Sequence, residues 1–309
     1  MELQYTILDV FTSKRLEGNP LAVVSVPAAL KDRLTQEAKL KVAKEFNLSE
    51  TVFLHEETNP QSREIDIFTI EREIPFAGHP TIGTAILVKN HVNPDVDTLV
   101  AKTGPIGIVS QTDNHVHARI PHNVHLHAKT LGDVVGAEHT GLSPVPEIRD
   151  AELKAPVFSV VKGMTFILVR LPSLELLGRV STAGRLDFDN LPSPLLDEGE
   201  WSESFVCRYY YVDVGEVDGE RGIRSRMIEL GFEDPATGSA ATALGSYLTL
   251  KEEGRGRKFR ITQGVEIGRT SHISVETTTQ EIDGSVKLVD LWLGGTAVVI
   301  MKGSLTVDV

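Results

Sequence analysis

The sequence predicts an α+β fold of two pseudo-symmetric domains, each a barrel-like mixed β-sheet wrapped around one central α-helix. A short turn into a helix occurs twice, at residues 78–85 and 233–240, with an offset of 155 residues. The residues that follow each copy are small or apolar on nearly every side, as in a helix that is buried all round. Most of the remaining chain has β-like patterning, so we expect a sheet to surround each helix.

Each copy of this repeat is expected to begin its helix at a proline. Pro80 and Pro235 superpose at this offset, and proline suits a first helical residue because an N–H there would have no partner. The same superposition places His79 on Asp234. Since a helix N-terminus favours a carboxylate or phosphate, the two helix starts form the predicted site, although His79 and Asp234 can also serve as ordinary caps.

The length of 309 residues suits two domains of about 150 residues each. We expect an N-terminal domain over residues 1–127 and a C-terminal domain over residues 128–309. The final strand, about residues 298–309, is free to return to the first domain. The boundary is placed where glycine and proline become frequent, because both residues interrupt helices and strands.

The charge balance of the chain argues against two classes of partner. A net charge of −12, from 43 acidic and 31 basic residues, disfavours nucleic acid and anionic membranes, since both recruit basic surfaces. Cys207 is the single cysteine, which excludes an intrachain disulfide and a thiolate-rich metal site. Neither a secretion signal nor an apolar run of roughly 20 residues is evident, so we expect a cytoplasmic protein.

The first half of the chain shows a hairpin, a helix and a strand in succession. Alternating apolar residues predict strands at 5–11 and 21–26, and apolar residues at fourfold spacing predict an amphipathic helix over 34–46. Asn47 can end that helix in a left-handed conformation. The next strand begins near residue 51, and Glu50 stands at its mouth, where a charged residue can also be merely exposed.

Five histidines gather after the first central helix: His115, His117, His122, His125 and His127. Imidazoles at alternate positions of a strand share one face and could hold a metal ion. Such a site needs three or four converging ligands with carboxylate support, and acidic residues are scarce between these histidines. We therefore expect a solvated strand face and no metal site.

The second half repeats the plan of the first. Strands are expected at 157–161, 166–171 and 205–214, with a surface loop over 187–200. Further strands are expected at 259–261, 272–277, 285–293 and 296–300. Gly294 and Gly295 are expected to make a tight turn between the last two.

Five motifs, taken together, resemble the PhzF-like phenazine-biosynthesis family. They occur in order and at comparable spacing over essentially the whole chain, and as a set they are highly specific. They are Asp9-Val10-Phe11-Thr12 with Gly18-Asn19-Pro20, Asn47-Leu48-Ser49-Glu50-Thr51, Pro75-Phe76-Ala77-Gly78-His79-Pro80-Thr81, Glu233-Asp234-Pro235-Ala236-Thr237-Gly238-Ser239-Ala240, and Gln263-Gly264 with Gly268-Arg269.

This resemblance implies the diaminopimelate-epimerase-like fold, with the active site in the cleft between two domains. It also implies an isomerase that needs no cofactor or metal, acts on a small carboxylate substrate and forms a homodimer. The substrate of the namesake enzymes is trans-2,3-dihydro-3-hydroxyanthranilate. Carried over by position, the implied catalytic residues are Glu50, His79 and Asp234, and the implied substrate-binding residues are Gly78, Gly238 and Ser239.

The residues themselves favour isomerisation over racemisation. Related racemases use two cysteines, one on each face of the reacting carbon, and this chain has only Cys207. One carboxylate, Glu50, could instead remove a proton and return it elsewhere on the same face, provided that desolvation raises its pKa toward neutrality. His79 and Asp234 would then orient the substrate's polar groups.

Two alternatives remain open. The first is a metabolite-binding protein that has kept the fold without catalysis. The second is a racemase or epimerase that uses Glu50 with Glu203 or Asp234 opposite it. Glu203 enters because residues 202–206 faintly repeat residues 49–53.

Overall fold

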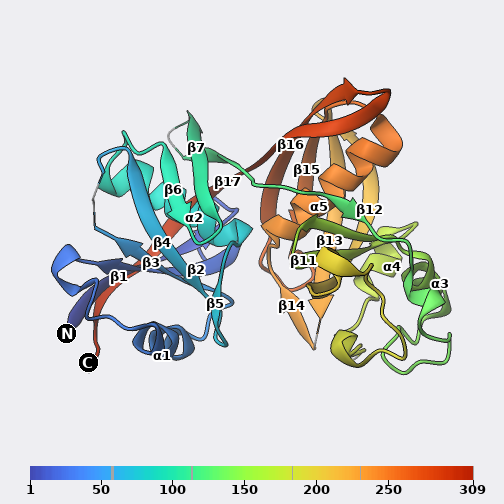
Figure 1. The fold of residues 1–309 in the computed structure, drawn as a ribbon, viewed down its shortest axis with the longest axis horizontal. Coiled ribbons are helices and arrows are strands. Elements are labelled where there is room, and N and C mark those ends of the chain that lie inside the picture. Colours follow the sequence, from blue (N-terminus) through green and yellow to red (C-terminus); the bar gives the residue numbers. More distant parts are fainter. Residues whose placement is uncertain (57–58, 113, 183, 230, 309) are drawn as a thin grey trace. The chain divides into compact units, whose positions relative to one another are not determined.

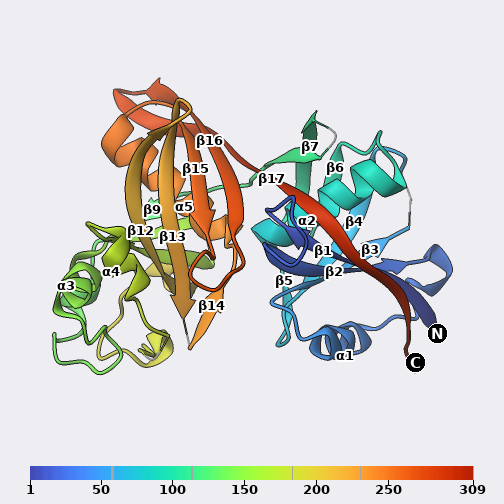
Figure 2. The ribbon, with the colours of Figure 1, turned by 180° about the vertical axis from the view of Figure 1, so that it is seen from behind.

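The computed structural model describes residues 1–56, 59–112, 114–182, 184–229 and 231–308 (Figures 1 and 2). It divides into two compact units. Unit 1 contains Met1–Ile120 and Trp292–Val309, and unit 2 contains Pro121–Leu291. The division falls before the expected boundary at 127/128, because β9 (His125–Leu126) pairs with a strand of unit 2. The returning segment likewise begins at Trp292, earlier than about residue 298.

Unit 1 is a barrel of strands that closes on itself around α2 (Gly78–Leu87). The pairing runs β1–β2–β3–β4–β6–β7–β8–β17 and back to β1. Every residue of α2 is buried, so the all-round apolar pattern has the predicted consequence. The strands are β1 (Glu2–Val10), β2 (Asn19–Val26), β3 (Thr51–His55), β4 (Ser62–Phe68), β6 (Thr98–Ala101), β7 (Gly104–Thr112), β8 (His115–Arg119) and β17 (Ser285–Thr306), with β5 (Glu73–Ile74) beside β4.

The helix α1 (Gln36–Phe46) packs on the outside of this barrel, as its spacing predicts. Thr35 caps its start by accepting a hydrogen bond from the N–H of Ala38, and Asn47 ends it with a φ of 51°. Lys39 is buried under the helix and forms an ion pair with Asp66 of β4, at 2.5 Å. The expectation for this segment is confirmed.

Unit 2 surrounds its own central helix, α5 (Gly238–Leu248), with a sheet paired as β9–β10–β11–β12–β13–β15–β16. On the outer face of this sheet, apolar residues from the segment that carries α3 (Pro146–Lys154) and α4 (Leu174–Gly178) form a second core. The strands are β10 (Val157–Val161), β11 (Met164–Arg170), β12 (Phe205–Val217), β13 (Glu220–Glu229), β14 (Phe232–Asp234), β15 (Lys258–Gln263) and β16 (Ser271–Ile282).

Short irregular helices complete the described chain. The π-helical segments Val88–Val92 and Thr249–Glu253 extend α2 and α5 respectively. The 3-10 turns are Ala28–Leu30, Leu131–Asp133, Phe188–Asn190 and Gly199–Trp201; the third lies in the expected surface loop over 187–200, and the fourth lies at the end of that loop. A sheet-rich chain with few helices confirms the predicted α+β class.

The expected turn at Gly294 and Gly295 is wrong, because β17 runs straight through both glycines. Gly294 pairs with His117, and Gly295 pairs with Val116. A Cβ on Gly295 would stand only 2.4 Å from the Phe11 ring, so this glycine lets an aromatic side chain lie against the strand. The glycine pair therefore marks the close approach of the Phe11 ring to the strand, and not a turn of the chain.

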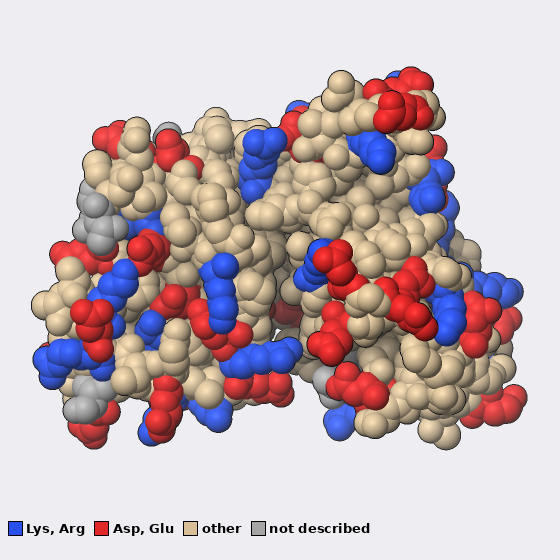
Figure 3. All heavy atoms as spheres, in the orientation of Figure 1, with Lys and Arg blue, Asp and Glu red and all other residues tan. Residues whose placement is uncertain are grey.

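On the face shown in Figure 3, basic and acidic side chains are interspersed rather than gathered by sign. Among the helices in the described part of the chain, none has both the length and the apolar character needed to cross a membrane.

Candidate active site

The starts of the two central helices align differently from the repeat seen in the sequence. Each helix begins at a glycine, Gly78 or Gly238, three residues after a proline that directly follows a short strand. Superposing these glycines gives an offset of 160 residues, which pairs Pro75 with Pro235. The expected offset of 155, with proline as the first helical residue, is therefore wrong. Pro80 is the third residue of α2, still inside the first turn where proline is tolerated.

This alignment separates the two titratable residues by position. His79 is the second residue of α2, and its counterpart in α5 is Ser239. Asp234 instead ends β14, four residues before α5 begins. The structure thus places Glu50, Gly78 and His79 in unit 1, and Asp234, Gly238 and Ser239 in unit 2.

Glu50 and His79 meet at the mouth of the unit 1 barrel. Glu50 immediately precedes β3, and the chain on its other side is fixed by the end of α1. Its Oε2 lies 3.3 Å from the Nδ1 atom of His79. The His79 side chain is 4% exposed, against 18% for Glu50. The carboxylate therefore lies between a buried imidazole and the surface.

Burial keeps the His79 imidazole neutral. Desolvation lowers its pKa from 6.5 to about 3, although a hydrogen bond to the backbone of Pro20 opposes this shift. Proline has no N–H, so the Pro20 carbonyl accepts and the ring donates. The ring atom Nε2 has no hydrogen-bond partner among the described residues. We therefore assign the ring proton to Nδ1, where it faces both Pro20 and Glu50, because a bare buried acceptor is less costly than a buried unpaired N–H.

Asp234 is held by a polar network inside unit 2. Its Oδ2 accepts a 2.6 Å hydrogen bond from the Thr237 hydroxyl, and its backbone carbonyl accepts from Nε2 of Gln263 at 2.8 Å. Gln263 also accepts from the Thr237 N–H at 3.2 Å and from the buried hydroxyl of Tyr209 at 3.1 Å. One amide side chain therefore fixes the whole turn that leads from β14 to α5.

Gly264 explains why the network needs the Gln263-Gly264 pair. Its φ is +75°, and a Cβ there would lie 2.4 Å from the Arg269 carbonyl oxygen and 2.6 Å from that of Pro235. Only glycine tolerates both the conformation and the space. The family motif contained this pair, but the roles of Gln263 and Tyr209 were not predicted. The one sequence feature that could have pointed to Gln263 is the glycine that directly follows it at the end of a strand.

The helix starts leave backbone donors without side-chain caps. Neither Ala77 before α2 nor Thr237 before α5 makes a side-chain capping hydrogen bond. The first N–H groups of a helix have no partner within the helix, and the helix dipole is positive at this end. Gly78 and Gly238 begin these turns, and neither carries a side chain over its own N–H group. Both starts can therefore bind a carboxylate.

The histidine cluster is not the expected solvated face. His117 and His127 are buried, and His125 and His127 lie with Asp197 in a group whose ligand atoms fall within 4.8 Å of one another. However, Nδ1 of His127 accepts the Asp197 N–H at 3.0 Å, and Nε2 lies 2.8 Å from the Ser159 hydroxyl. Both ring nitrogens are thus used by the protein. We interpret the group as a clamp that fastens the 187–201 segment to β9.

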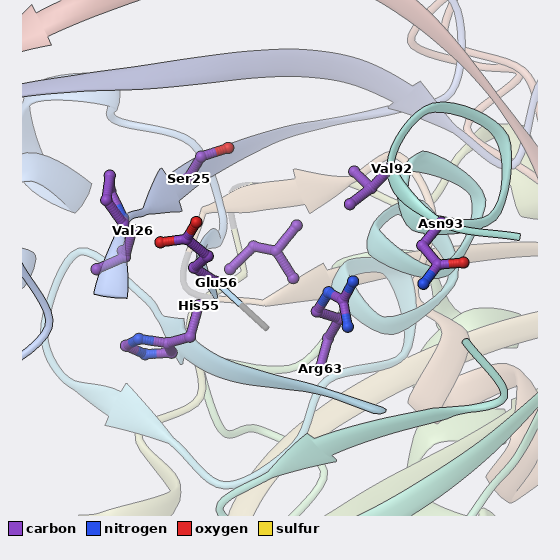
Figure 4. Close-up of a pocket in the computed structure, with 9 residues that line it drawn as sticks. Ser25, Val26, His55, Glu56, Arg63, Val92 and Asn93 are labelled. Atoms are coloured by element: carbon purple, nitrogen blue, oxygen red, sulfur yellow. The ribbon is translucent and has the colours of Figure 1, made fainter. Parts of the chain in front are cut away.

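A cavity of about 490 Å³ lies elsewhere in unit 1 (Figure 4). It is lined by the ends of β2 and β3, by Arg63, and by Val92 and Asn93 at the far end of the α2 extension. Glu50 and His79 stand at the opposite ends of β3 and α2. The cavity is therefore separate from the candidate site.

Cys207 lies within β12 and is fully buried. A thiol that reacts with a substrate must be reachable as a thiolate. The racemase mechanism needs two accessible cysteines. This chain has one cysteine, and that cysteine is buried.

The structure thus has a buried central helix in each unit, with His79 in the first turn of one and Asp234 just before the other. The model of the family described as phenazine biosynthesis-like protein matches residues 8–303. The chain belongs to this family, and it is an isomerase of the PhzF type.

Three relatives illustrate the match. An uncharacterized isomerase of Mesorhizobium japonicum is 35% identical, covering 97% of this chain and 98% of its own. A trans-2,3-dihydro-3-hydroxyanthranilate isomerase of Pseudomonas fluorescens is 31% identical, covering 86% and 87%. The crystal structure of a PhzF-family protein of Bacillus anthracis superposes with a TM-score of 0.72 over 99% of both chains at 20% identity, which supports the fold.

Proposed function

We propose that this protein moves a proton within a small, unsaturated carboxylate of the dihydro-hydroxyanthranilate type, with Glu50 as the proton shuttle. The observation that carries the proposal is the contact between Glu50 and a buried, neutral His79 at 3.3 Å. A base must keep its lone pair available while its position is fixed, and a neutral N–H donor fixes it without adding a second charge.

The proposed reaction needs one group that acts first as a base and then as an acid. Glu50 takes a proton from a substrate carbon, and the electrons of the broken C–H bond enter the conjugated system. Glu50 then returns the proton to another carbon of that system on the same face. The double bonds shift, no atom is oxidised or reduced, and neither a metal nor a cofactor is required.

The remaining candidate residues bind and orient in this proposal. The proposed donors to the substrate carboxylate are the backbone N–H groups around Gly78 at the start of α2 and around Gly238 and Ser239 at the start of α5. Such donors also stabilise the negative charge that develops on the substrate during the reaction. Asp234, whose position is fixed through Thr237 and Gln263, orients a polar group of the substrate. The homodimer and the cytoplasmic location stay predictions.

The relatives support the substrate class. The proteins named trans-2,3-dihydro-3-hydroxyanthranilate isomerase from Pseudomonas fluorescens and Pseudomonas chlororaphis are both 31% identical to this chain over 285 residues. That level of identity, together with Glu50, His79 and Asp234 in the family motifs, supports the namesake compound as the first substrate to test.

The test is proton NMR of trans-2,3-dihydro-3-hydroxyanthranilate in D₂O with the wild-type protein, Glu50→Gln and Glu203→Gln. Glu203 is an exposed glutamate before β12, so it is a matched control for the loss of one carboxylate. We expect conversion by the wild type and by Glu203→Gln, and none by Glu50→Gln. Full turnover by Glu50→Gln would overturn the assignment of the base.

A further inference from the structure

Both members of the proposed catalytic pair are fixed by the same turn, Asn19-Pro20 at the start of β2. The Pro20 carbonyl accepts from the His79 ring. The side-chain oxygen of Asn19 accepts a 3.4 Å hydrogen bond from the hydroxyl of Ser49, the residue directly before Glu50. Pro20 therefore contacts His79 itself, and the adjacent Asn19 contacts the residue before Glu50.

The turn is itself rigid. Asn19 is 1% exposed, and it pairs with Val10 across the β1–β2 hairpin. Gly18 before it has a φ of +70°, and a Cβ there would lie 2.4 Å from the Val10 carbonyl oxygen. The hairpin loop is also tied to the strand, because the buried Asp9 carboxylate accepts from the Leu16 N–H at 2.6 Å. Because the turn is rigid, it can hold the His79 ring and the Ser49 side chain, which it contacts, in fixed positions.

We propose that Asn19 is a positioning residue, which holds the Ser49-Glu50 corner so that the Glu50 carboxylate stays against His79. This inference rests on the proposed role of Glu50. The corner follows α1 and precedes β3, and Ser49, whose hydroxyl donates to Asn19, is next to the residue that carries the carboxylate. A displacement of about 1 Å at a reacting group can cost on the order of 10² in rate.

The test compares Asn19→Ala and Ser49→Ala with Thr35→Ala. Thr35→Ala deletes one side-chain hydrogen bond in the same unit, at the start of α1, and so weakens a helix cap without touching the Ser49-Glu50 corner. We expect kcat on the dihydro-hydroxyanthranilate to fall roughly 10- to 100-fold in the first two variants, with KM changed less than about threefold. Thr35→Ala should keep the wild-type kcat.

The double variant Asn19→Ala/Ser49→Ala decides between positioning and general damage. If Asn19 acts through Ser49, the double variant should be no more than about threefold slower than the slower single variant. Additive losses, or an Asn19→Ala enzyme with the kcat of the wild type, would overturn the proposal. Ser49→Ala removes only a hydroxyl from a half-buried residue, so it carries the test if Asn19→Ala does not fold.

A measurement without substrate separates this inference from the proposed function. In ligand-free protein, ¹⁵N NMR should show the His79 ring proton on Nδ1 and protected from solvent exchange. Asn19→Ala should speed that exchange by at least about tenfold, because Glu50 no longer covers the proton, and Thr35→Ala should not. Unchanged exchange would refute the positioning role. Full turnover by Glu50→Gln would refute the base and leave this result standing.

Discussion

The starts of α2 and α5 are equivalent turns that hold their titratable groups in opposite ways. His79 lies inside the first turn of α2, buried and neutral, with contacts to Pro20 and Glu50. Asp234 lies outside α5, on β14, and is fixed by hydrogen bonds through Thr237 and Gln263. The helix start is common to both units, whereas the titratable group sits at a different position in each.

This difference indicates which part of each half-site is shared. The shared part is a helix N-terminus that begins with glycine and lacks a side-chain cap, which suits anion binding by backbone groups. The part that differs is the side chain, so it can serve different roles in the two units. We therefore expect His79 and Asp234 to tolerate substitution differently from Ser239, the true counterpart of His79.

After the complete loss expected for Glu50→Gln, the largest effects are expected from His79→Gln and Asp234→Asn. Each should lower kcat/KM by roughly 10² to 10⁴, the usual range for a positioned acid–base group. His91→Gln is the control, because His91 is exposed on the extension of the same helix. Steady-state kinetics with the dihydro-hydroxyanthranilate measures all three. A loss below about threefold for either variant would remove that residue from the mechanism.

The next effect concerns the glycine that the Asp234 turn requires. Gly264→Ala should lower the free energy of unfolding by about 2 to 4 kcal/mol, because it combines an unfavourable φ with two backbone clashes. Gly254→Ala is matched in φ, at +65°, but has open space, so it should cost only about 1 kcal/mol. Urea unfolding compares the two variants. Equal costs would show that the clashes relax and that the turn is not rigid.

The sequence predicted helices and strands correctly where the local pattern of apolar residues, or a single capping residue, determines the structure. The buried helices α2 and α5, the cap at Asn47 and the strand at 157–161 all follow from local sequence. The repeat register failed because proline is tolerated both inside the first turn of a helix, as at Pro80, and in the turn before one, as at Pro235. The predicted turn at Gly294 and Gly295 is wrong because a glycine pair is typical both of a turn and of a close contact. The contact of Gly295 with Phe11, a residue distant in the sequence, shows that here it marks a close contact.

The candidate site could be predicted in part. The motifs predict Glu50, His79 and Asp234 as candidates, but the positions of Gln263, Tyr209 and Asn19 depend on pairing between distant strands. The clamp of His125 and His127 needed Asp197, which lies about 70 residues further along the chain. Spacing within a segment carries no information on such partners, so that cluster was misread as solvated.

The neutral state of His79 predicts a pH dependence of stability. Its pKa is about 3 in the folded protein, against 6.5 when exposed. Below pH 6.5 the unfolded chain therefore binds a proton that the folded protein does not bind, so stability falls as the pH falls toward 3. The slope from this group approaches about 1.4 kcal/mol per pH unit, and it should be absent in His79→Gln. Urea unfolding between pH 7 and 4 compares the slopes, and equal slopes would contradict the assignment.

The smallest effect is expected at Ser239, and it tests the equivalence of the two helix starts most sharply. If α5 binds the substrate carboxylate through backbone N–H groups, Ser239→Ala leaves those groups in place. Its KM should then rise by less than about tenfold, with kcat unchanged, since one neutral hydrogen bond contributes about 1 kcal/mol. A loss as large as that of His79→Gln would mean that the hydroxyl takes part in the chemistry. The shared helix position, rather than the residue type, would then carry the catalytic role in both units.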